Sequence, residues 1–172
     1  MPFPESFATA RLRAERLMPH HFTDLLRMHQ DAEQMAMLGG VRDETQTAEY
    51  LERNLKHWGT YGFGSWILRE ADGDRLVGRA ILRHLFLEGS DEVEVGYSLF
   101  PEFWGRGLAT EIARACMSFG REVLKLPSIV ALTLPANARS QRVLRKVGLE
   151  YQREVTHDGT LHMLFRSGQH AA

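Results

Sequence analysis

Two adjacent parts of the sequence carry residue types that could do chemistry: a glycine-rich segment at 104–110 and two carboxylates shortly before it. The segment reads WGRGLAT, and Gly105 and Gly107 would let the backbone approach an anion closely. A helical pattern follows, and the amides of a first helical turn have no partners within the helix, so they point at such an anion. We therefore expect a phosphorylated cofactor to bind at this segment.

The glycine segment admits two other interpretations. It half-resembles the dinucleotide fingerprint GxGxxG, but Thr110 replaces the last glycine, and the next strand reaches Pro135 without the acidic residue that would hold a ribose. No GxxxxGK(S/T) motif occurs, which argues against a nucleoside triphosphatase. The other interpretation, that the glycines simply shape a loop, stays open for this segment taken alone.

The elements that must position this chemistry follow from hydrophobic periodicity. The strand expected at 92–100 alternates between an apolar face and a second, polar or small-residue face. The apolar face consists of Val93, Val95, Tyr97 and Leu99, and the second face of Glu92, Glu94, Gly96 and Ser98. Further strands are expected at 8–18, 65–70, 75–87, 128–134, 149–155 and 161–165. Helices are expected at 19–28, 31–38, 44–59, 109–126 and 138–147.

Local signals support these elements and their order predicts the fold class. Asn137 is a typical N-cap for the last helix, and Asp158-Gly159 is a typical two-residue hairpin turn between the last two strands. The order is strand, helices, three strands, helix, strand, helix, two strands. It predicts one mixed α/β sheet with helices on its faces.

Composition sets bounds on function. The 172 residues fit a single domain, 1–172 with an ordered core of about 8–167. Lys plus Arg (21) nearly balances Asp plus Glu (22), so direct nucleic-acid binding is not expected. No apolar run approaches a membrane span and no secretory signal is evident, so a cytoplasmic protein is expected. The eight histidines show no metal-ligand spacing, and the single cysteine, Cys116, lies in an apolar helical stripe.

Taken together, the motifs resemble the GNAT superfamily of acetyl-CoA-dependent N-acetyltransferases. The matching segments are EVGYSL, PEFWGRGLATE and NARSQRVLRKVGL, in that order, and the resemblance covers nearly the whole chain. They are similar to the branch that includes ribosomal-protein N-terminal (Rim-type) acetyltransferases. The superfamily pattern is often Q/R-x-x-G-x-G/A, and Trp104, which is usual in that branch, takes its first position. The resemblance implies an α/β (α+β) fold with a mostly antiparallel sheet of six to seven strands, splayed in the middle, with helices on both faces.

The resemblance also implies where acetyl-CoA binds. The pantetheine arm would pair with the backbone of Tyr97, Ser98 and Leu99, and a splay between this strand and 128–134 would hold the thioester. Asn137 would hydrogen-bond the arm, and Ser140 would lie beside the leaving sulfur. The pyrophosphate would lie on the glycine segment, namely Trp104, Gly105, Arg106, Gly107, Leu108, Ala109 and Thr110. Arg106 and Arg139 either attract the phosphates or are ordinary solvated surface.

The chemistry of amine acylation suggests catalytic roles. It needs a neutral amine, a polarised thioester carbonyl and a proton for the leaving sulfur. A backbone N–H near Leu99 could polarise the carbonyl. Glu94 is the best candidate for the base and Glu92 the second, while an ordinary exposed strand carboxylate is the alternative for each. Ser140 competes with Tyr97 and Tyr151 for the role of proton donor, and a plain polar residue in a first helical turn is its alternative.

These inferences favour one function and leave two alternatives. The leading hypothesis is an N-acetyltransferase that moves acetyl from acetyl-CoA to a primary amine, either a protein N-terminus or a small molecule, in a ternary complex. No covalent acyl carrier is apparent. The alternatives are a non-catalytic CoA-binding sensor and a dinucleotide oxidoreductase. No metal, nucleic-acid or membrane partner is expected, and a homodimer is possible.

Overall fold

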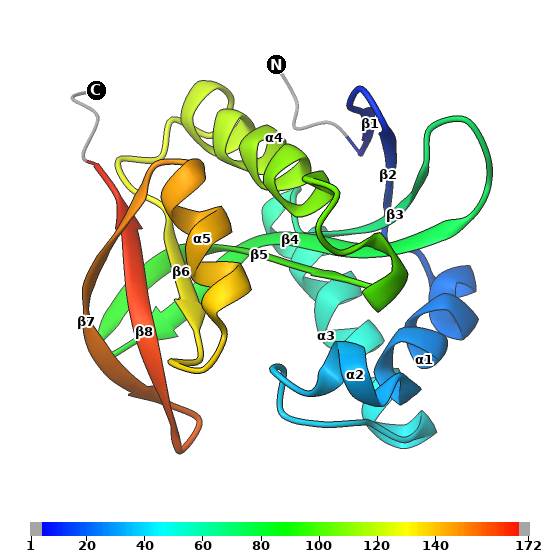
Figure 1. Cartoon of the computed structure of the whole chain (residues 1–172), viewed down its shortest axis with the longest axis horizontal. Coiled ribbons are helices and arrows are strands. Elements are labelled where there is room, and N and C mark those ends of the chain that lie inside the picture. Colours follow the sequence, from blue (N-terminus) through cyan, green and yellow to red (C-terminus); the bar gives the residue numbers. More distant parts are fainter. Residues whose placement is uncertain (1–4, 169–172) are drawn as a thin grey trace.

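The computed structural model describes residues 5–168, and every strand in that range belongs to one eight-stranded sheet (Figure 1). The strand order across the sheet is β1-β2-β3-β4-β5-β6-β8-β7. The strands are β1 (Ser6–Ala8), β2 (Leu12–Arg16), β3 (Ser65–Glu70), β4 (Leu76–Leu87), β5 (Ser90–Leu99), β6 (Val130–Thr133), β7 (Leu149–His157) and β8 (Thr160–Ser167). The helices are α1 (Phe22–Gln30), α2 (Ala32–Met35), α3 (Glu44–Tyr61), α4 (Leu108–Glu122) and α5 (Ala138–Lys146), and 3-10 turns lie at Pro19–His21 and Pro101–Phe103.

The sheet is split between β5 and β6. All other neighbouring strands of the described chain pair antiparallel, whereas β5 and β6 pair in parallel and at one register position, Glu94 opposite Val130. Figure 1 shows β6, β7 and β8 turned away from β4 and β5. Residues 95–99 of β5 therefore have no β6 partner beside them. This confirms the expected splayed, mostly antiparallel sheet, which is unlike the parallel sheet of a dinucleotide-binding fold.

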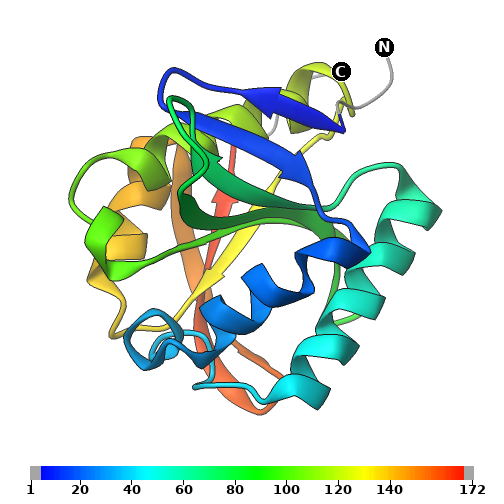
Figure 2. The ribbon, with the colours of Figure 1, turned by 90° about the vertical axis from the view of Figure 1, so that its right-hand side faces the viewer.

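Helices cover both faces of the sheet, as expected. Figures 1 and 2 show α4 and α5 on one side and α1, α2 and α3 on the other. The alternation of β5 agrees with this arrangement. The Tyr97 hydroxyl reaches Ser140 on α5, whereas the Ser98 hydroxyl accepts a hydrogen bond from Gln34 on α2. The two side-chain sets of β5 therefore face two different helical layers.

The helix α4 packs its apolar stripe against the sheet. Leu108, Ile112 and Cys116 lie on this stripe and are at most 3% exposed. Burial raises the pKa of the Cys116 thiol to about 12. The thiol therefore stays protonated at neutral pH, where it is a poor nucleophile, in line with its expected role in packing.

The sequence predicts six to seven strands, and the structure has eight. The stretch 8–18, predicted as one strand, forms β1 and β2 joined by a tight turn. In this turn Thr9 N donates to Leu12 O at 2.8 Å, and Leu12 N donates to Thr9 Oγ1 at 3.2 Å. The turn contains no Gly, Pro, Asn or Asp, so it carries none of the strongest turn signals.

Several predicted boundaries are wrong, and the helix predicted at 109–126 ends at Glu122. Two further boundaries are wrong for a similar reason. The helix predicted to end at Gly59 continues to Tyr61 and ends at Gly62, which adopts a left-handed φ of +74°. The strand β5 begins two residues earlier than predicted, because a two-residue turn, Glu88-Gly89, joins it to β4 with φ values of +48° and +88°. In both places several glycine or polar residues compete for the turn, and tertiary packing decides between them.

The other local signals are confirmed. Asn137 caps α5, and its Oδ1 accepts a hydrogen bond from Ser140 N at 3.1 Å. Asp158 and Gly159 form the turn between β7 and β8, with φ values of +48° and +73°. Positive φ at both central residues is the signature of the turn type that such hairpins favour.

None of the helices between residues 5 and 168 has both the length and the apolar character of a membrane span. The extreme ends of the predicted domain, 1–4 and 169–172, lie outside the described residues. The single-domain assignment stays a prediction.

Candidate active site

The glycine segment forms an open turn at the start of α4. Gly105 and Gly107 have φ values of +71° and +77°, a conformation that side chains disfavour. Gly107 is the N-cap of α4 and offers no side chain to bind the first amides. A helix N-terminus without a cap keeps its amides and the positive end of its dipole available to an anion. The segment therefore has the open glycine turn and the uncapped helix start that the phosphate prediction requires.

A brace that sequence reasoning missed holds this turn in place. Arg11, beside the β1–β2 turn, donates from Nη1 to Arg106 O at 2.7 Å and pairs through Nε with Glu111 Oε2 at 2.7 Å. The other carboxylate oxygen of Glu111 accepts from Thr9 Oγ1 and from Arg11 N. Burial alone would raise the pKa of Glu111, but these hydrogen bonds outweigh it and lower the pKa. Arg11 and Glu111 are 100 residues apart in the sequence, so no local sequence pattern could predict their contact.

The edge of β5 beyond Glu94 presents backbone groups to the split. Phe100 N donates to Val77 O across the β4–β5 ladder. Because successive residues of a strand direct their amides to opposite sides, Tyr97 and Leu99 direct theirs away from β4 and toward the split. The Leu99 carbonyl accepts from Trp104 Nε1 at 2.8 Å, which leaves its N–H and both backbone groups of Tyr97 for a ligand.

Ser98 differs from its two neighbours. By the same alternation its backbone groups face β4, opposite Arg79. Its side chain is buried on the side of α1–α3, where Oγ accepts from Gln34 Nε2 at 2.9 Å. Of the three residues predicted to pair with a pantetheine arm, Tyr97 and Leu99 have the required backbone direction and Ser98 does not.

Tyr97 and Ser140 meet on the opposite face, between β5 and α5. Tyr97 Oη lies 3.2 Å from Ser140 Oγ and 3.3 Å from Ser140 O. Burial raises the pKa of Tyr97 to about 12, although the hydrogen bond with Ser140 acts in the other direction. The third candidate for proton donor, Tyr151, lies on β7, is 45% exposed and packs against Phe165. The structure therefore brings two of the three candidates together.

Asn137 lies one helical turn before Ser140 at the start of α5. Its Oδ1 is used as the helix cap, while its Nδ2 donates to no residue of the described chain. The side chain is therefore oriented by the cap and keeps one free donor at the wall of the split. This is the group that could hydrogen-bond an amide-containing arm, as the sequence predicts.

The two candidate bases have different partners. Glu94 is 7% exposed, and its Oε2 accepts from Arg83 Nε at 3.0 Å and lies 3.0 Å from Arg83 Nη2. Its Oε1 accepts nothing from the described residues. The negative charge of Glu94 raises the pKa of Arg83. Both carboxylate oxygens of Glu92 instead accept hydrogen bonds from Arg166 on β8, at 2.9 and 2.7 Å. Glu94 is therefore oriented with a free oxygen, whereas Glu92 ties β5 to β8.

The two arginines predicted to attract phosphates lie at the mouth of the split. Arg139, in the first turn of α5, stacks on Trp104 with 3.9 Å between guanidinium carbon and ring centre. Arg106 is half exposed and lies 4.0 Å from Glu70 and 5.5 Å from the Phe103 ring centre. Arg139 thus reaches from one arm of the split to the other, and Arg106 stays beside the glycine turn.

A basic cluster that was not predicted from the sequence lies on the α1–α3 side of β4. Arg79 Nη1 donates to Tyr50 Oη at 2.7 Å, and Arg42 lies over the Tyr50 ring at 5.3 Å. Arg42 also donates to His29 Nε2 at 3.4 Å, and His29 Nδ1 bonds Thr47 Oγ1 at 2.9 Å. Its members come from α1, α3, β4 and the segment before α3, so their assembly depends on the fold.

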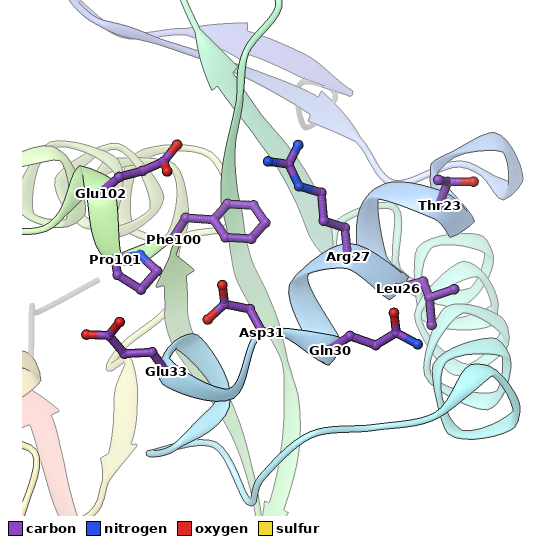
Figure 3. Close-up of a pocket in the computed structure, with 9 residues that line it drawn as sticks. All are labelled: Thr23, Leu26, Arg27, Gln30, Asp31, Glu33, Phe100, Pro101 and Glu102. Atoms are coloured by element: carbon purple, nitrogen blue, oxygen red, sulfur yellow. The ribbon is translucent and has the colours of Figure 1, made fainter.

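A surface cavity of about 700 Å³ lies beyond the end of β5 (Figure 3). It is lined by α1, the start of α2 and the segment that leads from β5 to the glycine turn. Its charged groups are Arg27, Asp31, Glu33 and Glu102. None of the predicted site residues lines this cavity. No cluster of three or more potential metal ligands occurs in residues 5–168.

Comparison with known proteins adds a family and a fold. The profile described as "Acetyltransferase (GNAT) domain" matches residues 11–150. The uncharacterized protein YkkB of Bacillus subtilis is 30% identical over 125 residues, which cover 73% of each chain. The FsC-acetyl coenzyme A-N(2)-transacetylase of Aspergillus fumigatus is 30% identical over 152 residues, covering 83% of this chain and 64% of that protein. The chain spans about half the length of several further relatives.

Solved structures show the same fold. The acetyltransferase from Agrobacterium tumefaciens strain C58 superposes with a TM-score of 0.83 at 23% identity, over 95% of this chain and 94% of that one. The ribosomal-protein-S5-alanine acetyltransferase from Vibrio fischeri gives a TM-score of 0.69 at 16% identity, over 95% and 96% of the two chains. At these identities the likeness concerns the arrangement of helices and strands.

Proposed function

The chain belongs to the acetyltransferase (GNAT) domain family, and we propose that it moves acetyl from acetyl-CoA to a primary amine by direct attack in a ternary complex. Family membership makes it an acyltransferase. The donor, the acceptor class and the residue roles below belong to the proposal. The acceptor is a small amine or a protein N-terminus.

The residues at the split fit acetyl-CoA. The uncapped N-terminus of α4 and the open turn at Gly105 and Gly107 suit a pyrophosphate, which needs several backbone donors at close range. The backbone groups of Tyr97 and the N–H of Leu99 suit the amide-containing pantetheine arm, laid along β5 like an added strand. Asn137 Nδ2 offers a further donor from the opposite wall.

Glu94 is the proposed base. When bound, acetyl-CoA would supply a thioester carbonyl to the amine and a thiolate leaving group. Glu94 Oε1, the free oxygen of the carboxylate, takes the amine proton directly or through one water. Arg83 holds the other oxygen and so fixes the direction of Oε1. Arg83 and Arg79 also place positive charge on this face, which favours the neutral form of a nearby amine.

The proposed proton donor lies on the other face of β5. Tyr97 keeps its proton at neutral pH because burial raises its pKa to about 12. Its hydroxyl and that of Ser140 form a pair that donates a proton toward the departing sulfur. The N–H of Leu99 points into the split, where it would donate to the oxygen on which negative charge develops.

One observation carries this proposal: the sheet parts at Glu94, with Glu94 on one face of β5 and the Tyr97–Ser140 pair on the other. A ligand lying along the open edge of β5 thus has a base on one side and a proton donor on the other. Removal of the amine proton and protonation of the leaving sulfur are thus assigned to residues on opposite sides of β5, and neither residue has to cross the strand.

The test is a turnover screen with acetyl-CoA against peptide N-termini, polyamines, amino acids and aminoglycosides, following thiol release. Steady release with at least one amine, and its loss in Glu94→Gln, is the expected result. Binding of CoA with no transfer to any amine would instead favour a sensor, and affinity for a nicotinamide cofactor would favour an oxidoreductase. The Rim-type branch predicts that peptide N-termini rank among the accepted amines.

A further inference from the structure

The strongest unexplained feature of the molecule is a buried positive charge on the same face of the sheet as the proposed base. Arg79 is 8% exposed, and its side chain has one hydrogen-bond partner among the described residues, the neutral Tyr50 hydroxyl. No carboxylate of the described chain lies within 4.0 Å of it. A buried guanidinium without an anion loses hydration that nothing else replaces, so such groups normally occur paired.

Arg42 adds a second unpaired charge to the same place. Arg42 and Arg79 lie over the ring of Tyr50, at 5.3 and 5.0 Å from its centre, and Arg42 likewise has no carboxylate within 4.0 Å in the described chain. Burial and then the like charge of Arg79 lower the pKa of Arg42. Both guanidiniums therefore lie around the Tyr50 ring, and neither has an anionic partner among the described residues.

His29 cannot supply the missing negative charge and is held neutral instead. Burial, followed by the charges of Arg79 and Arg42, lowers the pKa of His29 to about 3. The guanidinium of Arg42 can only donate, so His29 Nε2 must accept from it and Nδ1–H donates to Thr47. Every titratable group that contacts Tyr50 is therefore cationic or neutral.

The cluster shares a face with the proposed base. Across the β4–β5 ladder, Arg79 lies opposite Ser98 and Arg83 opposite Glu94, and both pairs project toward α1–α3. Between them, Ile81 lies opposite Gly96, and its side chain packs over this glycine. Arg83 lies four positions after Arg79 on β4, about 13 Å along the strand, so the acceptor has to span from one to the other. Tyr50 lies at the Arg79 end, where its hydroxyl accepts from Arg79 Nη1.

We propose that the amine acceptor carries a carboxylate, which Arg79 and Arg42 bind beside Tyr50 while the amine lies at Glu94. This inference rests on the proposed acetylation and names the acceptor class for the same site. The carboxylate of the acceptor would make a bidentate contact with arginine and so provide the anion that these guanidiniums lack in the described chain. A second ammonium at that end of the acceptor would instead meet two guanidiniums, so polyamines are disfavoured.

The carboxylate could belong to a free amino acid or to an acidic peptide. The buried Gln34 offers a hydrogen-bond acceptor that suits either ligand. One end of its carboxamide bonds Ser98 Oγ, while the other, Oε1, is buried without a partner in the described chain. An N–H donor on the acceptor would satisfy it. The acceptor class is thus an amine with both an N–H donor and an anion.

The experiment compares three amines of equal length that differ at the far end: 4-aminobutanoate, butylamine and 1,4-diaminobutane, which end in a carboxylate, a methyl and an ammonium. We expect kcat/KM for the carboxylate member to exceed the other two by roughly tenfold or more. Arg79→Gln should lower the carboxylate-to-methyl ratio by about tenfold, and Arg79→Lys by less. Arg114→Gln, at an exposed arginine of α4, is the matched control and should keep the ratio. A peptide pair with Asp or Asn as second residue separates the two carboxylate sources.

A binding readout separates failure of this inference from failure of the proposed function. Glutarate, which has no amine, should raise the thermal midpoint of the acetyl-CoA-saturated wild type but not that of Arg79→Gln, with CoA calorimetry confirming that the variant is folded. Turnover of butylamine or 1,4-diaminobutane equal to that of 4-aminobutanoate would overturn the carboxylate site and leave acetylation standing. Glutarate binding that depends on Arg79, with no amine turned over, would overturn the function and leave the carboxylate site standing.

Discussion

The guanidinium carbon of Arg139 lies 3.9 Å from the centre of the Trp104 ring, so the first turn of α5 touches the segment that leads into α4. This contact joins the two arms of the split sheet at the mouth of the proposed cofactor site. Trp104 is held in turn by the hydrogen bond from its Nε1 to Leu99 O. Arg139 is therefore placed where a phosphate-bearing ligand would enter.

We expect Arg139→Gln to weaken acetyl-CoA binding by about three- to tenfold at low salt, because a phosphate loses a charged donor. The difference should shrink at high salt, where exposed charges are screened. Titration of tryptophan fluorescence measures both affinities. Arg142→Gln, at an exposed arginine of the same helix, is the control. An equal effect of the two substitutions would mean that Arg139 acts only through the general charge of α5.

Gly107→Ala should weaken acetyl-CoA binding by roughly tenfold or more, because a methyl group would stand where the pyrophosphate approaches the backbone. Gly159→Ala is a strain-matched control at the far hairpin: φ is +73° there and +77° at Gly107, and neither Cβ would meet a heavy atom closer than 3.5 Å. Both should lose about 1 kcal/mol of stability. Calorimetry with CoA separates them, and equal affinities would remove Gly107 from the site.

Glu94→Gln should lower turnover by roughly tenfold or more at neutral pH and leave acetyl-CoA affinity nearly intact, because the amide cannot accept the amine proton. Glu92→Gln is the matched control on the same strand. It should weaken the contact with Arg166 and cost about 1 kcal/mol of stability while turnover per folded molecule is kept. Unchanged turnover in Glu94→Gln would rule out Glu94 as the base.

Tyr97→Phe should lower kcat by roughly tenfold or more, and Ser140→Ala by less, if the tyrosine is the final proton donor. Because the pKa of Tyr97 is about 12, the donor stays protonated and kcat should show no alkaline fall from it up to pH 10. Rate profiles from pH 6 to 10 measure this. Tyr151→Phe, at an exposed tyrosine, should match the wild type. An alkaline fall near pH 9 that vanishes in Tyr97→Phe would contradict the assignment.

The buried His29 should make the fold acid-sensitive. Its pKa is about 3 in the folded chain, against an ordinary value of 6.5, so below pH 6.5 the unfolded chain binds a proton that the folded chain refuses. Stability therefore falls as the pH drops from 6.5 toward 3, by at most about 1.4 kcal/mol per pH unit from this group. Urea unfolding at pH 7.5, 6 and 5 gives the slope.

The substitution His29→Gln should flatten that slope, although it removes hydrogen bonds to Thr47 and Arg42 and so lowers stability at pH 7.5. His162→Gln, at an imidazole on the last hairpin, should keep the wild-type slope. Identical slopes in wild type and His29→Gln would contradict the assignment of this acid sensitivity to His29.

Features that depend on a few consecutive residues were predictable from the sequence. The glycine turn, the Asn137 cap and the Asp158-Gly159 hairpin each follow from backbone preferences of the residues themselves. The alternation of β5 in the sequence also predicts that Glu94 and Tyr97 lie on opposite faces. Such signals suffice for the order of elements and for the location of the proposed cofactor site.

Features that join distant residues were not predictable in this way. The brace between Arg11 and Glu111 and the ion pair of Glu92 with Arg166 depend on which strands and helices become neighbours. The basic cluster around Tyr50 is the clearest case, because its arginines look like ordinary surface charges in the sequence. The charge of the acceptor therefore could not be inferred from the sequence.

The two faces of β5 also separate what each part of the sequence is free to change. Glu94 and the basic cluster lie under α1, α2 and α3, whereas Tyr97, Ser140 and the glycine turn belong to the layer of α4 and α5. On the proposed assignment, substitutions in the first layer would change the amine that is accepted and leave the contacts to the acetyl donor unchanged. The strand β5 therefore separates an acceptor side from a donor side, and each can change independently. Descendants of one acetyltransferase could diverge in the acceptor they use while they keep the donor site unchanged.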